Sequence, residues 1–109
     1  MAGINRLAVV YATTDTTYGS GTLAFASTAN YLLSVIATNR ENTDAEIYVY
    51  SVPTGSSDPN EWVLVAYKLP LPAYNSYETF RFAVNNTDTL YVAGSAGVQY
   101  SVQGIEQIG

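Results

Sequence analysis

The chain has 109 residues, a formal net charge of −5, and neither cysteine nor histidine. Without cysteine there are no disulfides or thiolate metal sites, and without histidine the commonest general base and metal ligand is missing. A length of this order predicts one domain, so we expect a single domain over residues 1–109. With most familiar catalytic groups missing, we expect a protein that is not an enzyme and needs no cofactor.

The charge balance also bears on the choice of partner. The chain has nine acidic and four basic residues, and charged residues make up only 12% of it. Such a chain repels phosphate groups, so nucleic acid and anionic membranes are poor partners. The surface is instead expected to be polar through hydroxyl and amide groups, which suits a protein or a sugar as partner.

The first half of the chain predicts four strands. Residues 1–6 are expected to form a short N-terminal arm, and the apolar run that follows is too short for a signal-peptide core or a membrane span. A segment rich in threonine and glycine at 13–21 favours a loop. The expected strands are residues 7–12, 21–26, 31–38 and 45–52.

Residues 31–52 are the most readable stretch, and they predict a long antiparallel hairpin. The first arm is apolar at odd and even positions alike, which indicates a strand covered on both faces. The second arm alternates, with Ile47 and Val49 on one face and Tyr48 on the other. We therefore expect the first arm deep in a sheet and the second with one face open.

The second half of the chain begins with the strongest breaker. Residues 53–60 contain two prolines and a glycine, which predict a long exposed loop. Pro70 and Pro72 are expected to stop the next strand in an edge-like connection. In the strand after it, Phe80 and Phe82 are expected to point inward. The expected strands are residues 61–69, 77–84, 89–93 and 98–102, with 104–109 as an extension of the last.

About eight short strands separated by turn clusters, without helical periodicity, predict an all-β fold. The expected architecture is a single antiparallel β-sandwich of the jelly-roll type. A chain made only of strands also leaves sheet edges that invite association.

Two groups of residues with side-chain oxygens are candidates for chemical sites. Asn42, Asp44 and Glu46 alternate as oxygen ligands of calcium do, but the loop lacks the glycine and the ligand count of a calcium loop. Asp58 and Glu61 resemble a glycosidase pair only in spacing, and a domain of this size has little room for a substrate cleft. We expect the first group to face water and the second not to form a glycosidase site.

The aromatic residues are a stronger signal than the charges. Ten tyrosines and one tryptophan supply amphipathic rings that fit a protein interface, a sugar platform or cross-strand pairs within a sheet. Proline-marked loops and a cation in the N-terminal arm are further contact candidates. The residues that we expect at an interface are Arg6, Tyr48, Tyr50, Pro53, Trp62, Tyr67, Pro70, Pro72, Tyr74 and Tyr77.

The order of these signals resembles a known group of proteins. The runs that carry the resemblance are residues 31–40, 45–49, 65–71, 87–92 and 98–106. From about residue 18 to residue 108, the sequence resembles small β-sandwich virion structural proteins of tailed bacteriophages. Those proteins are capsid decoration (cement) proteins, often homotrimers, or components of head fibres, necks or tails, and they carry no enzymatic residues.

The resemblance implies a capsid decoration protein that bridges adjacent capsid subunits. Its partner is then the major capsid protein or another virion protein, with no nucleic acid or membrane involved. The expected location is the outer surface of the virion capsid, after synthesis in the host cytoplasm. The alternatives are a fibre, neck or tail component, or a carbohydrate-binding or host-binding module that uses Trp62 and surface tyrosines.

Overall fold

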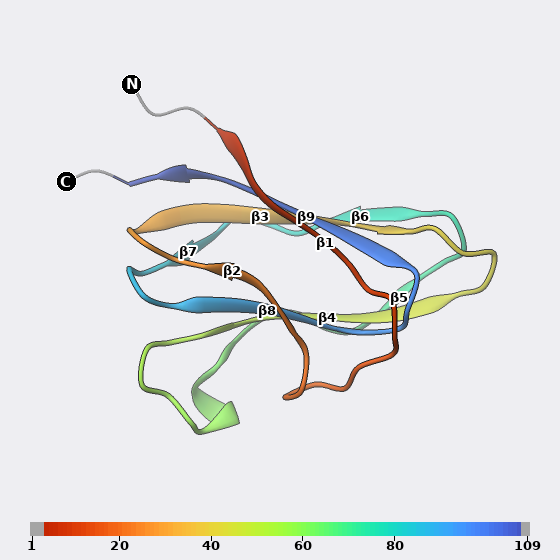
Figure 1. Cartoon of the computed structure of the whole chain (residues 1–109), viewed down its shortest axis with the longest axis horizontal. Helices are drawn as coiled ribbons and strands as arrows, with labels where there is room; N and C mark the ends of the chain where they lie inside the picture. The colour runs from red at the N-terminus through yellow and green to blue at the C-terminus, as the bar shows by residue number, and fades with distance from the viewer. Residues whose placement is uncertain (1–3, 108–109) are drawn as a thin grey trace.

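Residues 4–107, which the computed structural model describes, form nine strands and one short 3-10 helix, η1 (Figure 1). The arrows of Figure 1 lie in two layers that extend along the long axis of a domain measuring 44 × 33 × 20 Å. The elements are β1 Asn5–Tyr11, β2 Thr22–Ala26, β3 Tyr31–Asn39, β4 Ala45–Val52, η1 Pro59–Glu61, β5 Val63–Leu71, β6 Ser76–Glu78, β7 Phe82–Val84, β8 Thr89–Gly94 and β9 Val98–Glu106.

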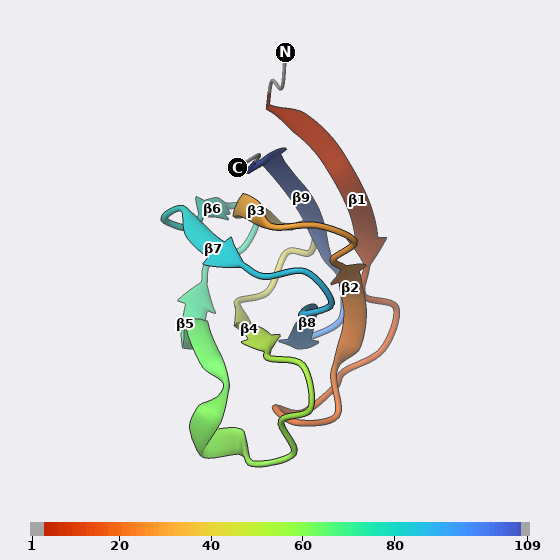
Figure 2. The same cartoon turned by 90° about the vertical axis from the view of Figure 1, so that its left-hand side faces the viewer.

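The strands form two antiparallel sheets that face each other across the core (Figure 2). One sheet has the order β1-β9-β3-β6, with β7 also paired to β3, and the other has the order β2-β8-β4-β5. The chain pairs its first strand with its last and then works inward: β1 with β9, β2 with β8, β3 with β6 and β7, and β4 with β5. This nesting is the jelly-roll arrangement, so the predicted all-β antiparallel sandwich is confirmed.

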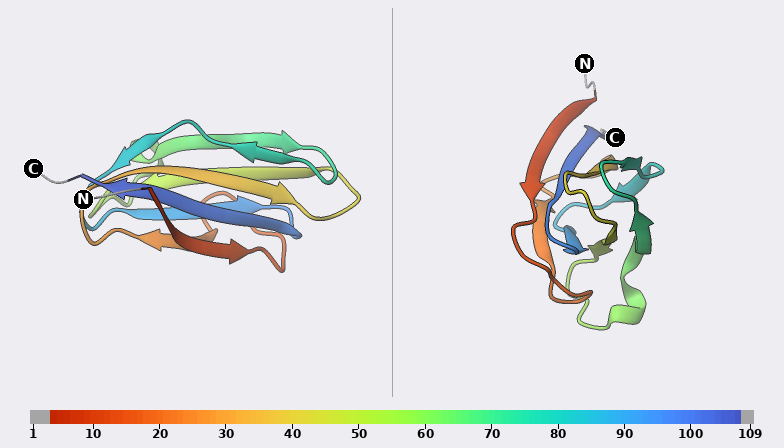
Figure 3. Two further views of the ribbon diagram at one scale, coloured as in Figure 1. Left: turned by 90° about the horizontal axis from the view of Figure 1, so that it is seen from above. Right: turned by 90° about the vertical axis from the view of Figure 1, so that its right-hand side faces the viewer.

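The predicted hairpin over residues 31–52 is wrong. β3 lies in the first sheet and β4 in the second, so residues 40–44 cross between layers instead of turning back within one sheet (Figure 3). Each arm has an apolar face that packs into the core from its own side. Two adjacent apolar strands joined by a polar loop fit a sheet crossover as well as a hairpin. β4 instead forms an antiparallel hairpin with the next strand, β5.

Asn39 holds the crossover in place. Its side chain is 1% exposed, and Nδ2 donates to the carbonyl oxygens of Thr43 at 2.8 Å and Leu71 at 3.1 Å. Its Oδ1 accepts from the backbone N–H of Glu41 at 3.0 Å. One buried amide therefore satisfies backbone groups of the crossover and of the end of β5.

The predicted single strand over 77–84 is interrupted, which is why nine strands appear instead of about eight. Thr79 is 5% exposed and bonds to Val35 of β3 through both its side chain and its backbone. An extra residue at this break shifts the alternation of inward and outward side chains. Phe80, which we expect to point inward, is therefore 60% exposed. The alternation then resumes, and Phe82 is buried as predicted.

The prolines end β5 less sharply than predicted. Pro70 lies within β5, which ends at Leu71, and it is tolerated there because β5 is an edge strand. The expected start at residue 61 is also shifted, since Glu61 belongs to η1 and the strand begins at Val63. The Asp58 side chain caps η1 by accepting from the N–H of Asn60.

At the N-terminal end of the described chain, the first strand begins earlier than expected, and at the C-terminal end the last strand extends as expected. Arg6, which the sequence placed in an arm over residues 1–6, lies in β1, while residues 1–3 of that arm are outside the described part. At the other end β9 continues to Glu106, as the predicted extension requires, and residues 108 and 109 are not described.

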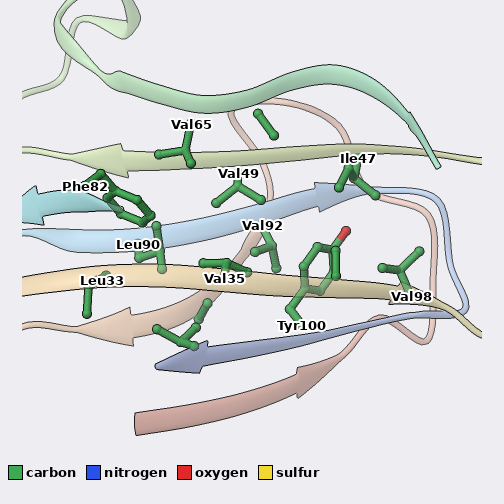
Figure 4. Close-up of a cluster of buried hydrophobic side chains, with 14 of the residues drawn as sticks. Leu33, Val35, Ile47, Val49, Val65, Phe82, Leu90, Val92, Val98 and Tyr100 are labelled. Carbon is green, nitrogen blue, oxygen red and sulfur yellow. The ribbon is translucent and has the colours of Figure 1, made fainter. Parts of the chain in front are cut away.

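Aliphatic side chains from both sheets fill the space between the layers (Figure 4). Leu33, Val35, Ile47 and Val49 are 0% exposed. Burying a side chain of this size contributes about 1.5–3 kcal/mol. The phenol of Tyr100 also enters the core, where it is 1% exposed and its hydroxyl donates to the carbonyl oxygen of Ala93 at 3.4 Å. The opposite faces of the sheets are left for other contacts.

Candidate functional site

The outer face of the β2-β8-β4-β5 sheet has an apolar row that crosses all four strands. Leu23 pairs with Tyr91, Tyr91 with Tyr50, and Tyr50 with Leu64. Tyr50 and Tyr91 each lie between two buried residues of their own strands, and Leu23 and Leu64 each precede one, so all four side chains point away from the core. Leu23 is 48% exposed and Leu64 46% exposed, whereas Tyr50 between them is only 2% exposed.

Tyr50 is covered because a ring stack is built around it. Its ring stacks on Tyr91 at 5.7 Å between centroids with an interplanar angle of 12°, and on Trp62 at 5.3 Å with an angle of 8°. Trp62 reaches this position because it follows directly after η1. The Tyr50 hydroxyl accepts from the N–H groups of Gly19 at 3.3 Å and Gly21 at 3.2 Å, which fastens the β1–β2 loop over the sheet.

The same loop places Tyr18 in contact with four other rings. Its centroid lies 4.9 Å from Tyr50, 5.4 Å from Tyr67, 5.6 Å from Trp62 and 5.8 Å from Tyr48. We call these rings the aromatic cluster, and its members are Tyr18, Tyr48, Tyr50, Trp62, Tyr67 and Tyr91.

The phenols of Tyr18 and Tyr48 stay protonated at neutral pH. Burial raises the pKa of Tyr18 above its ordinary value, and the nearby Tyr50 and Tyr67 phenols raise it further. Desolvation raises the pKa of Tyr48, as does the Glu46 carboxylate that accepts its hydroxyl at 3.2 Å. These hydroxyls therefore serve as hydrogen-bond donors, with no capacity for base catalysis near pH 7.

Two shallow hollows adjoin the cluster. The first, of about 170 Å³, has aromatic walls and is lined by Gly19, Tyr50, Val52, Trp62 and Tyr91. The second, of about 240 Å³, is more polar and is lined by Asp15, Thr16, Thr17, Tyr18, Glu46, Tyr48, Gly94 and Ser95. A smaller hollow of about 90 Å³ lies on the outer face of the other sheet, around Ser34, Glu78 and Gln103. We take the cluster and the second hollow as the candidate site.

The structure brings together four of the ten residues predicted at an interface: Tyr48, Tyr50, Trp62 and Tyr67 belong to the aromatic cluster. The others are dispersed: Arg6 in β1, Pro53 after β4, Pro70 in β5, Pro72 and Tyr74 in the β5–β6 connection, and Tyr77 in β6. None of these six is in ring contact with the cluster.

Two of the predicted contact residues are unsuited to meeting a partner directly. Tyr50 is 2% exposed because Tyr18 and Trp62 cover it, and Tyr77 packs against the core. Tyr67 at 56% and Tyr74 at 69% are exposed as an interface requires. The role of Tyr67 and Tyr74 at an interface stays a prediction.

Sequence reasoning missed Tyr18 and Asp15. Both lie in a loop that the sequence identifies only as rich in threonine and glycine, and nothing local shows that the loop folds back over β4. The one usable signal was the pair Gly19 and Gly21, because a side chain on Gly21 would approach the Val92 carbonyl oxygen to 2.4 Å. A close approach of this kind marks a backbone packed against a strand.

Two of the acidic residues considered as chemical sites have structural roles. Asp44 accepts from the N–H of Ala73 at 3.2 Å, and Asp58 caps η1. Across residues 4–107, three or more metal-ligating side chains are nowhere grouped so that they could hold an ion. The same part of the chain has no helix of the length and apolarity needed to cross a bilayer.

Comparisons with known proteins do not show a family for this chain. No protein-family model matches the sequence, and no curated protein matches it. Among solved structures, the chain is similar to the Clostridium thermocellum N-terminal endo-1,4-beta-D-xylanase 10B CBM22-1 and GH10 modules complexed with xylohexaose. The match has a TM-score of 0.47 and 11% identity, and it covers 99% of this chain and 25% of that chain.

Proposed function

We propose that this chain is a structural protein that associates with other proteins through the edges of its sheets. The observation that carries the proposal is the exposed edge strand β5, where Val63 and Leu64 are each 46% exposed and Tyr67 is 56% exposed. An unpaired strand edge offers free backbone donors and acceptors, and exposed apolar side chains beside it favour coverage by a partner.

The opposite side of the sandwich has a second apolar area. Val9 and Tyr11 of β1 are 49% and 41% exposed, and Leu23 of the neighbouring β2 is 48% exposed. β1 and β2 are the edge strands of their sheets on this side (Figure 2). A molecule with an apolar edge on each side can contact two neighbours at once, which a bridging protein requires.

Within this class, we propose a decoration protein on the capsid of a tailed bacteriophage. The support is the resemblance of residues 18–108 to such virion proteins, together with a net charge of −5 that disfavours contact with packaged DNA. As a trimer at a junction of major capsid protein subunits, the sandwich would resist outward displacement of the shell without contacting the genome. In this role the protein would bind its neighbours and catalyse no reaction.

Two measurements test the proposal. The first is the mass of the purified chain in solution, compared with that of a variant carrying Val63→Lys and Leu64→Lys on β5. A trimer that the variant converts to monomers supports association through this edge. A monomer at all concentrations, or an unchanged mass in the variant, contradicts it.

The second measurement is the heat resistance of virions with and without the chain, combined with an averaged image of the particle. We expect density for this protein on the outer capsid surface and loss of heat resistance in particles that lack it. Density at the neck, tail or a fibre, or full heat resistance without the chain, would reject the cementing role.

A further inference from the structure

The polar hollow beside the aromatic cluster has a composition that protein contact does not require. It lies between the β1–β2 loop, the start of β4 and the end of β8. Tyr48 of β4 pairs across the sheet with Ala93 of β8, which is followed by Gly94. Gly94 lines the hollow and has no side chain to fill it, and a space of about 240 Å³ lies beside Tyr48.

We propose that this hollow binds one pyranose ring of a neutral glycan, an activity beyond the assembly role. A sugar ring has an apolar face of C–H groups and a rim of hydroxyls, so a site for it needs an aromatic ring beside fixed polar groups. The hollow has both, since Tyr18 and Tyr48 are on its wall and Asp15 and Glu46 are on its rim.

The two carboxylates retain free acceptor capacity. Asp15 uses Oδ1 to accept from the N–H of Ala96 at 2.8 Å, and Glu46 uses Oε1 to accept from the Tyr48 hydroxyl at 3.2 Å. Within residues 4–107, the second oxygen of each group has no hydrogen-bond partner among the protein atoms, and both side chains are exposed. A carboxylate held by one oxygen presents the other in a fixed direction to sugar hydroxyls.

Hydrogen bonds within the protein hold the walls of the hollow. The backbones of Thr16 and Gly94 exchange two hydrogen bonds of 2.8 and 3.1 Å, and Ser95 Oγ accepts from the N–H of Glu46 at 3.0 Å. The rings of Tyr18 and Tyr48 are fixed by contact with each other and with Tyr67. Because the walls are already ordered, the protein loses little conformational entropy when a ligand binds.

The charge of the hollow selects among ligands. Two carboxylates in a chain of net charge −5 disfavour uronic acids and other anionic sugars. A divalent cation is less suited than a sugar, because two carboxylates without a third grouped acidic ligand fall short of the six to eight oxygens that calcium takes. Neutral sugars are therefore the class that fits.

The test is a titration of the isotopically labelled full chain with neutral hexasaccharides of glucose, mannose, galactose and xylose, followed by amide chemical shifts. We expect saturable shifts at Asp15, Tyr48 and Ser95 with at least one neutral sugar, and none with oligogalacturonate. Calcium chloride alone serves as a separate titrant. Shifts at these amides with calcium, or no saturable shift with any neutral sugar, would overturn the proposal.

Variants separate a binding role from a folding role. Glu46→Gln and Tyr48→Ala should each weaken the sugar affinity about tenfold or more, equivalent to about 1.4 kcal/mol. Tyr48→Phe keeps the ring, so its sugar affinity should fall less than that of Tyr48→Ala. The matched control is Glu78→Gln on the opposite sheet, which should bind as the wild type does; equal losses in this control and in Glu46→Gln would reject the site. The virion measurements are independent, so either proposal can fail alone.

Discussion

Thr79 and Val35 are joined by two hydrogen bonds in which a side chain replaces a backbone group. The Val35 N–H donates to Thr79 Oγ1 at 2.9 Å, and the Thr79 N–H donates to the Val35 carbonyl oxygen at 2.9 Å. The hydroxyl thus completes the sheet at the point where β6 gives way to β7. This exchange lets the chain insert a residue without leaving a buried donor unpaired.

Replacement of Thr79 by valine should therefore destabilise the fold by about 1–3 kcal/mol, because the Val35 N–H is left buried without an acceptor. Urea unfolding followed by circular dichroism measures the change. Thr79→Ser keeps the hydroxyl, so its free energy of unfolding should fall less than that of the valine variant. If the serine and valine variants are equally stable, the hydroxyl is not the stabilising group.

Asn39→Ala should cost about 2 kcal/mol or more, because it leaves the Thr43 and Leu71 carbonyl oxygens and the Glu41 N–H without their partner. The free energy of unfolding in urea is again the measurement. Asn42→Ala, at an exposed position of the same crossover, should stay within about 0.5 kcal/mol of the wild type. Similar losses in both variants would contradict the role of the buried amide.

Gly94 and Gly55 form a matched pair for testing close packing. Both have positive φ, +122° and +78°, but a Cβ on Gly94 would lie 2.0 Å from the Glu46 carbonyl oxygen, whereas one on Gly55 would meet nothing within 4 Å. Gly55→Ala should cost only the backbone strain of about 1–2 kcal/mol. Gly94→Ala should lower the melting temperature much further. Equal shifts would mean that steric contact with β4 is not limiting.

Stability at alkaline pH should depend on Tyr100. Burial raises the pKa of its phenol above the ordinary value of 10.0. Below pH 10 the phenol is neutral in folded and unfolded chains, so its contribution is fully present. As pH rises from 10 toward the folded pKa, only the unfolded chain loses the proton, and stability falls.

The check is urea unfolding of the wild type and Tyr100→Phe at pH 8, 10 and 11. The free energy of unfolding should fall more steeply with pH in the wild type, by up to about 1.4 kcal/mol per pH unit for this group. The two proteins differ only at this residue, so the contributions of all other groups cancel in the comparison. Parallel slopes would show that Tyr100 ionises equally in both states.

The strands could be predicted from the sequence, but their pairing could not. Alternation and turn residues are local, and they located β2, β3 and β4 within one residue at each end. Whether residues 31–38 pair with 45–52 depends on distant segments, because β9 competes for the same edge of β3. Similarly, the Thr79 side chain points inward because the Val35 N–H needs an acceptor, and Val35 lies far away in the sequence.

The candidate site could be predicted only in part for the same reason. Tyr48 lies between core residues on its strand, so its outward direction is a local property. Buried and exposed residues do not alternate along β5, so the exposure of Tyr67 does not follow from a local pattern. Tyr18 lies in a loop without periodicity, and its place over Tyr50 results from hydrogen bonds between Gly19, Gly21 and a hydroxyl many residues later. Loop positions fixed by a single side chain leave no repeating signal in the sequence.

The place of β9 between β1 and β3 has a consequence for synthesis on the ribosome. The nascent chain makes β1 and β3 early, but the strand that joins them emerges only when residues 98–106 have been added. Until then both strands have unpaired edges and apolar side chains exposed to other nascent chains. The domain should therefore fold late in translation, and a product cut before residue 98 should aggregate instead of folding in part.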